Sequence, residues 1–441
     1  MRAKSPASEG SPRSWSPLLA APALYLAATT LYAQPAALEF SFSNPGARSL
    51  GLGGAFVALA DDATAAYVNP AGLVQLTRME VSAELRRWDY STPFVVGGRL
   101  SGDPTGIGVD TTAGLQTEVS SDTLSGLSFL SFVYPKTRWS VAFYRHQLAD
   151  FVASTETRGS FRDESGVTIR SEDVRRSIDL EILNYGISAS FRVVDRFSLG
   201  VGLSHYQGDF TGVTGIYLAT GPFDPITYTP ERRFATQVVL VDDTDVAFNV
   251  GLLWSITDQW SLGGFFREGP TFGLRLEGRT GLLFQPPMPE GTLFELEDAT
   301  VGFPNVYGLG IAFRSRNGAW TTSFEWDHVG YSHIFDSIDF EDLESDTTRI
   351  DDADELRVGL EYVFLKTTPV VAARAGVWRD PDHRPRTIED DLLVRALFPE
   401  GSDEIHLAVG VGLAFKKFQL DLAGDFSEFV DTVGLSAIYK F

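Results

Sequence analysis

One stretch decides the fold class: residues 405–415 read IHLAVGVGLAF, with an apolar residue at every second position. This period of two is typical of a β-strand that has one apolar face. The same alternation recurs in residues 356–364 and again in the last segment, which ends on Phe441. The chain is therefore predicted to be all-β.

Extending this pattern along the chain predicts fourteen strands. Connections after the even-numbered strands are short, as at Asn317-Gly318, a pair typical of two-residue hairpins. Most connections after the odd-numbered strands are long, and this contrast between the two rims is typical of outer-membrane barrels. The strands are expected at 79–90, 124–134, 138–152, 176–192, 196–212, 236–256, 259–273, 305–315, 319–331, 354–365, 369–379, 403–415, 417–427 and 430–441.

Aromatic residues flank the short turns, for example Tyr134 and Trp139 or Trp254 and Trp260. Such residues form a girdle where a barrel meets the membrane interface, whereas a soluble β-sandwich has no need of one. The opposite face of the strands carries glycine and charge. Because lipid offers no hydrogen bonds, a sheet within it must close. Residues 79–441 are thus expected to form a transmembrane antiparallel β-barrel of fourteen strands.

The composition excludes several classes of protein. The chain has 441 residues, 36 Lys and Arg against 58 Asp and Glu, and a net charge of −22. This balance argues against nucleic-acid binding, which needs a basic surface. The absence of cysteine excludes disulfides, thiolate metal sites and a cysteine nucleophile. A hydrophobic fraction of 44% argues against disorder.

The segment before the first strand divides into two parts. Residues 1–33 have a basic start, an apolar stretch and a small residue at the end, as in a cleaved signal peptide. The alternative is an anchor that stays attached. Residues 34–78 are rich in glycine and alanine, lack the strand period and are expected to plug the lumen as a hatch. The alternative is a periplasmic tail or an irregular domain outside the barrel.

A resemblance rests on residues 47–73, which read ARSLGLGGAFVALADDATAAYVNPAGL. A Gly/Ala stretch, an acidic pair, an aromatic residue and then Asn-Pro-Ala-Gly precede the first strand. This segment resembles the hatch of FadL/TodX-type outer-membrane transporters of long-chain fatty acids and other hydrophobic compounds. The resemblance covers nearly the whole mature chain at the level of architecture, but only the hatch at the level of motif.

The resemblance implies that apolar surface on the third and fourth extracellular loops captures the ligand. The ligand would then move to a pocket against the hatch and leave sideways through the barrel wall. Many apolar residues in these otherwise acidic loops agree with capture, although they could also pack on one another as a lid. The candidates are Ile216, Tyr217, Leu218 and Phe223 in the third loop, and Leu282, Leu283, Phe284, Met288 and Phe294 in the fourth.

A phase break in the third strand marks a candidate exit. If the face of Trp139 and Phe143 continued, Arg145 and Gln147 would face lipid, which is costly for a charge. A bulge near Arg145, His146 and Gln147 would reset the phase and could form the lateral opening. The alternatives are that Arg145 snorkels to the interface or that the strand boundary lies elsewhere.

Several hatch residues are candidates for roles in the gate. Gly53, Gly54 and Gly72 would allow close backbone approach beside Phe56. Asp61 and Asp62 are expected to pair with lumen arginines, which could alternatively meet a ligand carboxylate. Asn69 and Pro70 are expected to fix the turn from hatch to wall. The lumen arginines considered are Arg267, Arg357 and Arg374.

The sequence indicates a channel and not an enzyme. Asp327 and His328 are adjacent in a strand and should face opposite sides, and Asp382-His383 has no nucleophile nearby. No metal or cofactor is expected. The expected partners are a hydrophobic molecule such as a fatty acid, outer-membrane lipid, and the barrel assembly machinery through the strand ending at Phe441. The protein is expected to be a monomer in a bacterial outer membrane. The alternatives to a transport function are a plug or shuttle of a secretion system, or a structural surface protein.

Overall fold

The computed structural model describes residues 44–171, 173–225, 228–283, 289, 291–336, 348–387 and 401–441. The predicted signal peptide and residues 34–43 of the predicted hatch lie outside these ranges. None of the helices in the described part of the chain has the length and apolarity needed to cross a bilayer.

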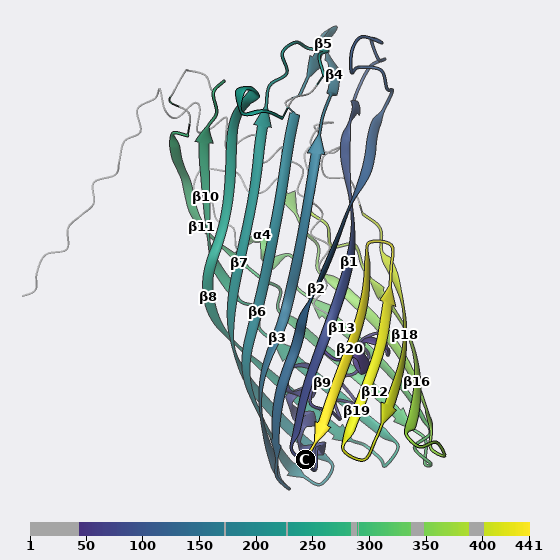
Figure 1. Cartoon of the computed structure of the whole chain (residues 1–441). Helices are drawn as coiled ribbons and strands as arrows, with labels where there is room; N and C mark the ends of the chain where they lie inside the picture. Colours follow the sequence, from purple (N-terminus) through teal and green to yellow (C-terminus); the bar gives the residue numbers. More distant parts are fainter. Residues whose placement is uncertain are drawn as a thin grey trace, which may run out of the picture.

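Fourteen strands form the described wall, if two interrupted strands are counted once each, which confirms the predicted number. Six long strands lie side by side and form what we term the long-strand side (Figure 1). They are β1 (Glu80–Arg99), β2 (Leu115–Pro135), β3 (Trp139–Thr157), β6 (Asp173–Val194), β7 (Phe197–Tyr217) and β8 (Arg233–Ser255).

Six shorter strands form the short-strand side, and two interrupted strands connect the two sides. The short strands are β13 (Trp320–Val329), β15 (Ala353–Phe364), β16 (Val370–Asp380), β18 (Glu404–Ala414), β19 (Phe418–Phe426) and β20 (Val430–Lys440). The interrupted strands are β9 (Trp260–Arg267) with β10 (Thr271–Thr280), and β11 (Leu293–Gly302) with β12 (Val306–Arg314). Small elements in the connections are β4 (Ser160–Glu164), β5 (Val167–Arg170), η2 (Pro230–Arg232), α4 (His333–Asp336), β14 (Thr348–Arg349) and β17 (Arg386–Thr387).

The barrel closes where its first and last strands meet. Residues 80–90 of β1 pair antiparallel with residues 440–430 of β20. The neighbouring wall strands are also antiparallel, as expected for consecutive strands joined by turns. Closure thus leaves neither the first nor the last strand as a free edge, which a sheet in lipid could not have.

The two sides differ in height by a factor of about two. Strands of the long-strand side contain 19–23 residues, whereas those of the short-strand side contain 9–12. Because about 9–11 tilted residues cross a bilayer, the long strands extend well beyond it. The predicted boundaries of these strands were therefore too short. Above the membrane the outer face meets water, so the apolar alternation fades while backbone pairing continues.

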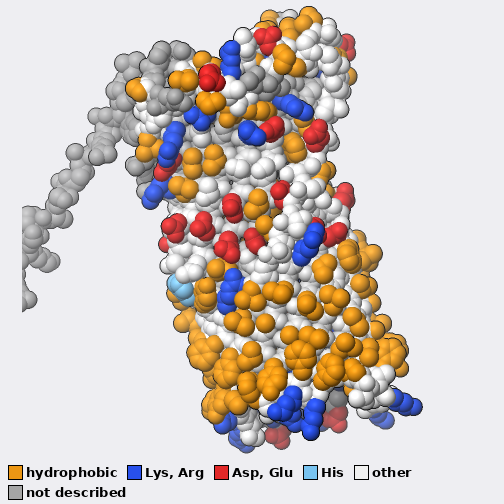
Figure 2. Space-filling model, in the orientation of Figure 1, with side chains coloured by type: hydrophobic (Ala, Val, Ile, Leu, Met, Phe, Trp, Pro, Cys, Tyr) orange, Lys and Arg blue, Asp and Glu red, His pale blue; other side chains and the backbone are white. Residues whose placement is uncertain are grey.

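The outer surface carries an apolar band at the end of the short turns (Figure 2). Charged side chains gather below the band, where basic ones predominate, and both acidic and basic side chains lie above it on the face shown. Exposed aromatic rings near the turns include Tyr134, Trp139, Phe191, Trp254 and Trp320. This arrangement confirms the predicted interfacial girdle at this rim.

Proline interrupts two strands of the wall; one of them was predicted to be continuous over 259–273, whereas β11 lies in a segment that was predicted to be a loop. Pro270 separates β9 from β10, and Pro304 separates β11 from β12. Because proline has no N–H to donate, a ladder is broken where it falls. The amide of Phe303 donates to the carbonyl of Pro270, so the two breaks lie side by side.

Residues 44–76 lie inside the barrel and form the described part of the hatch. They contain the short helices α2 (Ala47–Leu50), α3 (Ala65–Val68) and η1 (Pro70–Gln75), and most of their side chains are buried. Helix α2 packs against β18, β19 and β20, whereas α3 and η1 pack against β3 and β6, and η1 also against β7 and β8. The hatch therefore spans the lumen from the short-strand side to the long-strand side.

Candidate functional site

Wall carboxylates bind backbone amides of the first part of the hatch. The amides of Phe56 and Val57 both donate to Glu325 Oε2 of β13, each at 2.7 Å. The amide of Gly46 donates to Glu84 Oε2 of β1 at 3.0 Å. Charge-assisted bonds of this kind are stronger than bonds between neutral groups. These contacts fix residues 46–57 against the wall.

Hydrogen bonds to backbone carbonyls hold the second part of the hatch, including one from Arg192 of β6 to the carbonyl of Val74 at 2.7 Å. Ser188 Oγ of β6 donates to the carbonyl of Ala66 at 2.6 Å, and Ser198 Oγ of β7 donates to that of Ala71 at 2.9 Å. Asn69 Nδ2 donates to the carbonyls of Val57 and Leu252, both at 3.0 Å. The hatch thus contacts the long-strand side without ion pairs in residues 63–76 of the described chain.

The expected local role of Asn69 and Pro70 is confirmed. Asn69 is extended, with φ −154° and ψ 98°, and its Oδ1 accepts from the amide of Ala71 at 3.2 Å. Pro70 occupies the first position of η1, where a missing N–H costs nothing. This turn directs the chain from the hatch toward β1.

Glycines allow the hatch and wall backbones to touch. Gly53 and Gly54 have positive φ values of 62° and 80°. A Cβ on Gly53 would lie 3.1 Å from the amide of Val377, and one on Gly54 would collide with the guanidinium of Arg357. A Cβ on Gly72 would collide with the backbone of Ala60. The predicted need for close approach at all three positions is therefore confirmed.

The predicted partners of Asp61 and Asp62 were wrong. Asp61 pairs with Arg48 of the hatch itself, at 2.5 Å, and with Arg314 of β12, at 2.7 Å. Burial alone would raise the pKa of Asp61, but these two guanidinium groups hold it well below the usual carboxyl range. Asp62 lies 3.7 Å from Arg48, and its Oδ1 accepts from the amide of Thr64 at 2.9 Å.

The lumen arginines named from the sequence are engaged elsewhere. Arg374 bridges Glu361 and Asp421, each at 2.7 Å. Arg357 pairs with Asp327 and Glu355 and lies 4.0 Å from the ring centre of Trp378. Carboxylates thus already compensate Arg357 and Arg374.

Arg267 holds an aromatic residue of the hatch in place of a carboxylate. Its guanidinium lies 3.8 Å from the ring centre of Tyr67 and donates to the Tyr67 carbonyl at 3.2 Å. The Tyr67 ring also contacts the rings of His146 and Tyr144, with centroid distances of 4.3 Å and 6.1 Å. Tyr67, which sequence reasoning missed, therefore links the hatch to β3 and β9.

The predicted phase break in β3 is confirmed as a bulge. The ladder between β3 and β6 shifts by one residue between Gln147 and Ala149, with Leu148 as the extra residue. Before the bulge Tyr144 and His146 are buried, and after it Phe151 and Ala153 are buried. The inward face thus changes from even to odd positions.

The wall is also incomplete beside this bulge. Pairing between β2 and β3 ends at Phe129 and His146, although both strands continue. Gln147 Nε2 donates across the outer side to Asp150 Oδ2 at 2.9 Å and to Glu181 Oε1 at 3.1 Å. Tyr90 of β1 donates to the Asp150 carbonyl at 2.6 Å. Of these bonds only that of Tyr90 reaches β3 from the far side of the gap, because Gln147 and Asp150 belong to β3 and Glu181 to its paired neighbour β6. We term this place the β3 window.

Arg145, the charge that suggested the phase break, still points outward. It is half-buried, and its guanidinium donates to the carbonyl of Leu127. This bond directs the charge toward a carbonyl of β2. Arg145 lies beyond Phe143, the last exposed apolar residue on the outer face of β3. The bulge and an outward-facing Arg145 therefore occur together.

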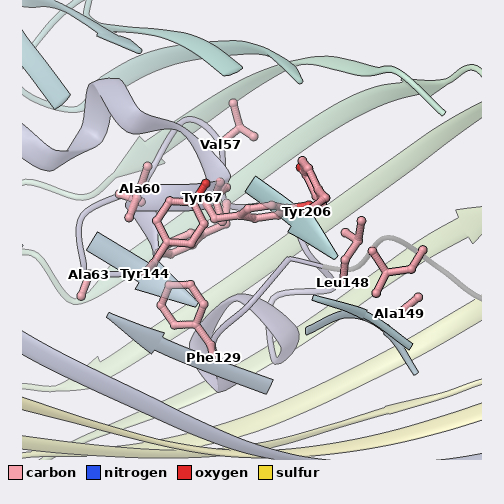
Figure 3. Packing of buried hydrophobic residues seen from close by; sticks show 14 of the residues in the cluster. Val57, Ala60, Ala63, Tyr67, Phe129, Tyr144, Leu148, Ala149 and Tyr206 are labelled. Carbon is pink, nitrogen blue, oxygen red and sulfur yellow. The ribbon is translucent and has the colours of Figure 1, made fainter. Parts of the chain in front are cut away.

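The lumen beside the window is apolar. Figure 3 shows the rings of Tyr67, Tyr144 and Phe129 next to one another, with Leu148 and Ala149 from β3 beyond Tyr206. The same cluster continues along the inner face of the long strands. Its members there include Trp88, Tyr90, Phe151, Ile178, Leu180, Ile182, Val241 and Phe272.

The third-loop residues are distributed between strand and loop. Ile216 and Tyr217 end β7 and are not loop residues; Ile216 is buried and Tyr217 packs on the ring of Tyr228. In the loop itself, the amide of Leu218 donates to the carbonyl of Arg232, and the ring of Phe223 stacks on Phe161. These contacts favour packing of the loop on the barrel rim.

The fourth loop begins later than predicted because β10 continues to Thr280. Leu282 is exposed and Leu283 is half-buried. Phe294 belongs to β11 and not to the loop. Phe284 and Met288 lie outside the described residues.

The residues considered for catalysis lie apart. Asp327 is buried against Arg357, whereas His328 faces outward and contacts Asp354 at 2.9 Å, as their adjacency in a strand predicts. His383 stacks on Tyr331, with ring centroids 4.2 Å apart. In the described ranges, no group of three or more His, Asp or Glu side chains is placed to hold a metal ion.

Comparisons with known proteins agree with this architecture. Residues 25–427 match the model of a family described as "Outer membrane protein transport protein (OMPP1/FadL/TodX)". A search of curated protein sequences gave no match.

Solved structures of low sequence identity share the fold. A Pseudomonas aeruginosa FadL homologue is 14% identical, with a TM-score of 0.63 over 92% of this chain and 100% of its own. The toluene transporter TodX of P. putida is 15% identical, with a TM-score of 0.57 over 91% and 99%. The monoaromatic hydrocarbon channel CymD is 14% identical, with a TM-score of 0.57 over 91% of this chain and 99% of its own. This chain belongs to the OMPP1/FadL/TodX family of transport proteins and is a β-barrel of the bacterial outer membrane.

Proposed function

We propose that this protein is a passive uptake channel for hydrophobic molecules, such as long-chain fatty acids, and that it releases them sideways through the β3 window. Membership of the family supports the transport of hydrophobic compounds. Related folds include a toluene transporter and a monoaromatic hydrocarbon channel. The continuous apolar inner face of the long-strand side offers such molecules a surface from the rim to the hatch.

One observation carries the lateral route: the hatch touches the wall where the backbone ladder is broken. Tyr67 contacts His146, which is the last residue of β3 that pairs with β2. Movement of the Tyr67 ring would therefore reach the window directly. The bond from the Tyr90 hydroxyl to the Asp150 carbonyl would act as the latch, since it joins β1 to β3 and can break without disturbing any strand pairing.

The proposed function also covers export, gating, ligand capture and assembly. Residues 1–33 would be removed on export, and residues 34–78 would form the gate of the barrel at 79–441. Apolar side chains at the rim, including Leu282 and Phe223, would capture the ligand. The protein would work as a monomer without a cofactor, and the strand ending at Phe441 would engage the barrel assembly machinery.

Deleting Leu148 tests the lateral route. The deletion removes the extra residue of the bulge, so the ladder becomes regular while Ala149 and Phe151 keep their inward positions. We expect uptake of labelled palmitate by a complemented deletion strain to fall to the level of the empty vector. The matched control Leu148→Ala keeps the bulge and should retain at least half of the uptake.

Folding of both variants is checked by heat-modifiable migration of the purified barrels. A folded Leu148 deletion that transports palmitate like the wild type would exclude release at this window. Wild-type uptake equal to that of the empty vector would count against the transport proposal itself.

A further inference from the structure

The short turns of the barrel carry most of the lysines of the chain. The sequence contains six lysines, of which Lys4 lies in the predicted signal peptide and Lys440 ends β20. The other four lie in short turns, and we term them the rim lysines: Lys136, Lys366, Lys416 and Lys417. The long connections therefore carry no lysine at all.

The short turns are basic although the chain is acidic. They comprise residues 136–138, 195–196, 256–259, 315–319, 365–369 and 415–417. Their basic residues are the rim lysines with Arg138, Arg196 and Arg316, and their acidic residues are Asp195 and Asp258. The whole chain has a net charge of −22. Basic side chains also predominate below the apolar band in Figure 2, so positive charge is concentrated at this rim.

The rim lysines differ from exposed bases of the extracellular end in lacking an acidic partner. All four are exposed, and none forms an ion pair with a described residue. At the extracellular end, by contrast, Arg175 pairs with Glu156 at 2.9 Å, and Arg379 pairs with Asp403 at 2.5 Å. Acids are in excess in this chain and yet are not placed beside the rim lysines. Their charge thus stays available to a group outside the protein.

Aromatic rings place the rim lysines at the level of the lipid head groups. Lys136 Nζ lies 4.6 Å from the ring centre of Tyr134. Residues 416–417 lie between Phe415 and Phe418, whose ring centroids are 6.3 Å apart. Interfacial rings lie at head-group depth, and long basic side chains next to them reach the same layer. The turns that hold these lysines have only three to five residues, so they keep the charge close to the membrane.

The distribution around the rim indicates the kind of anion. Lys136 lies on the long-strand side and the other rim lysines lie on the short-strand side. A docked protein would cover one sector of this rim, whereas lipid surrounds the whole barrel. Basic residues beside a bilayer attract anionic head groups, and each additional base adds to the attraction. Both acids of the turns, Asp195 and Asp258, lie in turns without a rim lysine.

We propose that the rim lysines bind the head groups of anionic phospholipids, such as phosphatidylglycerol, in the leaflet that meets the short turns. Short turns face the periplasm in outer-membrane barrels, so these lipids belong to the periplasmic leaflet. The inference narrows the expected lipid partner to one class of head group and does not depend on what the channel carries. Binding at turns on both sides would hold the barrel at a fixed depth in the membrane.

Association of spin-labelled phosphatidylglycerol and phosphatidylcholine with the full-length barrel in phosphatidylcholine vesicles tests this inference. The wild type should prefer phosphatidylglycerol about threefold. High salt should reduce the preference, because exposed charges are screened. Changing all four rim lysines to Gln should abolish the preference, and changing them to Arg should keep it. The matched control changes four ion-paired arginines of the extracellular end to Gln, alters the net charge equally and should keep the preference: Arg162, Arg175, Arg349 and Arg379.

An unchanged preference in the Lys→Gln variant would overturn the assignment, and so would a wild type that binds both lipids equally. An equal loss in the arginine control would also overturn it, because the net charge of the molecule and not the rim would then set the preference. Heat-modifiable migration checks that each variant is folded. Palmitate uptake is measured separately, so failure of the transport proposal would leave this result unaffected.

Discussion

The two sides of the barrel present opposite chemistry to the same hatch. The inner face of the short-strand side carries paired charges, such as Glu361 with Arg374, and binds the hatch through carboxylates. The long-strand side is largely apolar within, and its wall is interrupted at the β3 window. Charge fixes position through directed bonds, whereas apolar packing tolerates sliding. The difference indicates a hatch with an anchored part, residues 46–62, in which Asp61 also pairs with Arg314 of the wall, and a movable part, residues 63–76.

The largest effect is expected at the ring that joins the movable part to β3. Tyr67→Ala removes a fully buried aromatic side chain and should destabilise the hatch by about 3–5 kcal/mol. Hydrogen exchange of peptides from residues 63–76 measures this loss. Tyr67→Phe is the control, since the Tyr67 hydroxyl has no hydrogen-bond partner among the described residues, and it should behave like the wild type. Equal effects of the two variants would refute a packing role.

The anchored part should respond next most strongly. Glu325→Ala leaves the amides of Phe56 and Val57 without their acceptor, at a cost of about 2–4 kcal/mol. Exchange should rise in peptides covering residues 46–57 and stay unchanged around α3. Glu164→Ala, at an exposed site on β4, serves as the control and should change neither. Uniform loosening of the whole hatch would show that it moves as a single unit.

A smaller, pH-dependent effect is expected at Asp61. Its pKa is lower in the folded protein than in the unfolded chain, because Arg48 and Arg314 outweigh the effect of burial. The ion pair therefore stabilises the protein above the ordinary carboxyl pKa of about 4, and this stabilisation is lost as the pH falls through the folded-state value. Asp61→Asn should lower Tm at neutral pH, and the difference from the wild type should shrink below about pH 4. A difference that is constant with pH would contradict the ion-pair role.

The smallest effect is expected on the outer surface. Arg87 and Asp89 of β1 form an ion pair at 2.8 Å, with side chains 58% and 39% exposed. Because water screens such pairs, Arg87→Ala should leave the stability close to that of the wild type. Chemical denaturation of the two proteins measures this difference. A loss comparable to that of Glu325→Ala would mean that exposed pairs matter as much as the hatch anchors.

Much of the fold could be predicted because lipid imposes one apolar face on every spanning strand. This constraint revealed the fourteen strands and also the phase break at Arg145, where a charge interrupts the apolar face. The constraint does not act above the membrane, so the sequence of the upper halves of the long strands lacks the apolar alternation and resembles that of loops. The breaks at Pro270 and Pro304 follow from the missing N–H and could have been anticipated.

The partners within the lumen could not be predicted in the same way. Alternation shows which side chains point inward, but not which of them meet across the barrel. Arg48 pairs with Asp61 only because the hatch folds back on itself between α2 and α3.

Hydrogen exchange of the wild-type hatch, with and without palmitate, tests the division into an anchored and a movable part most directly. The account predicts faster exchange of amides in residues 63–76 when palmitate is bound, and no change in residues 46–62. Faster exchange in residues 46–62, or an equal response of both parts, would contradict it.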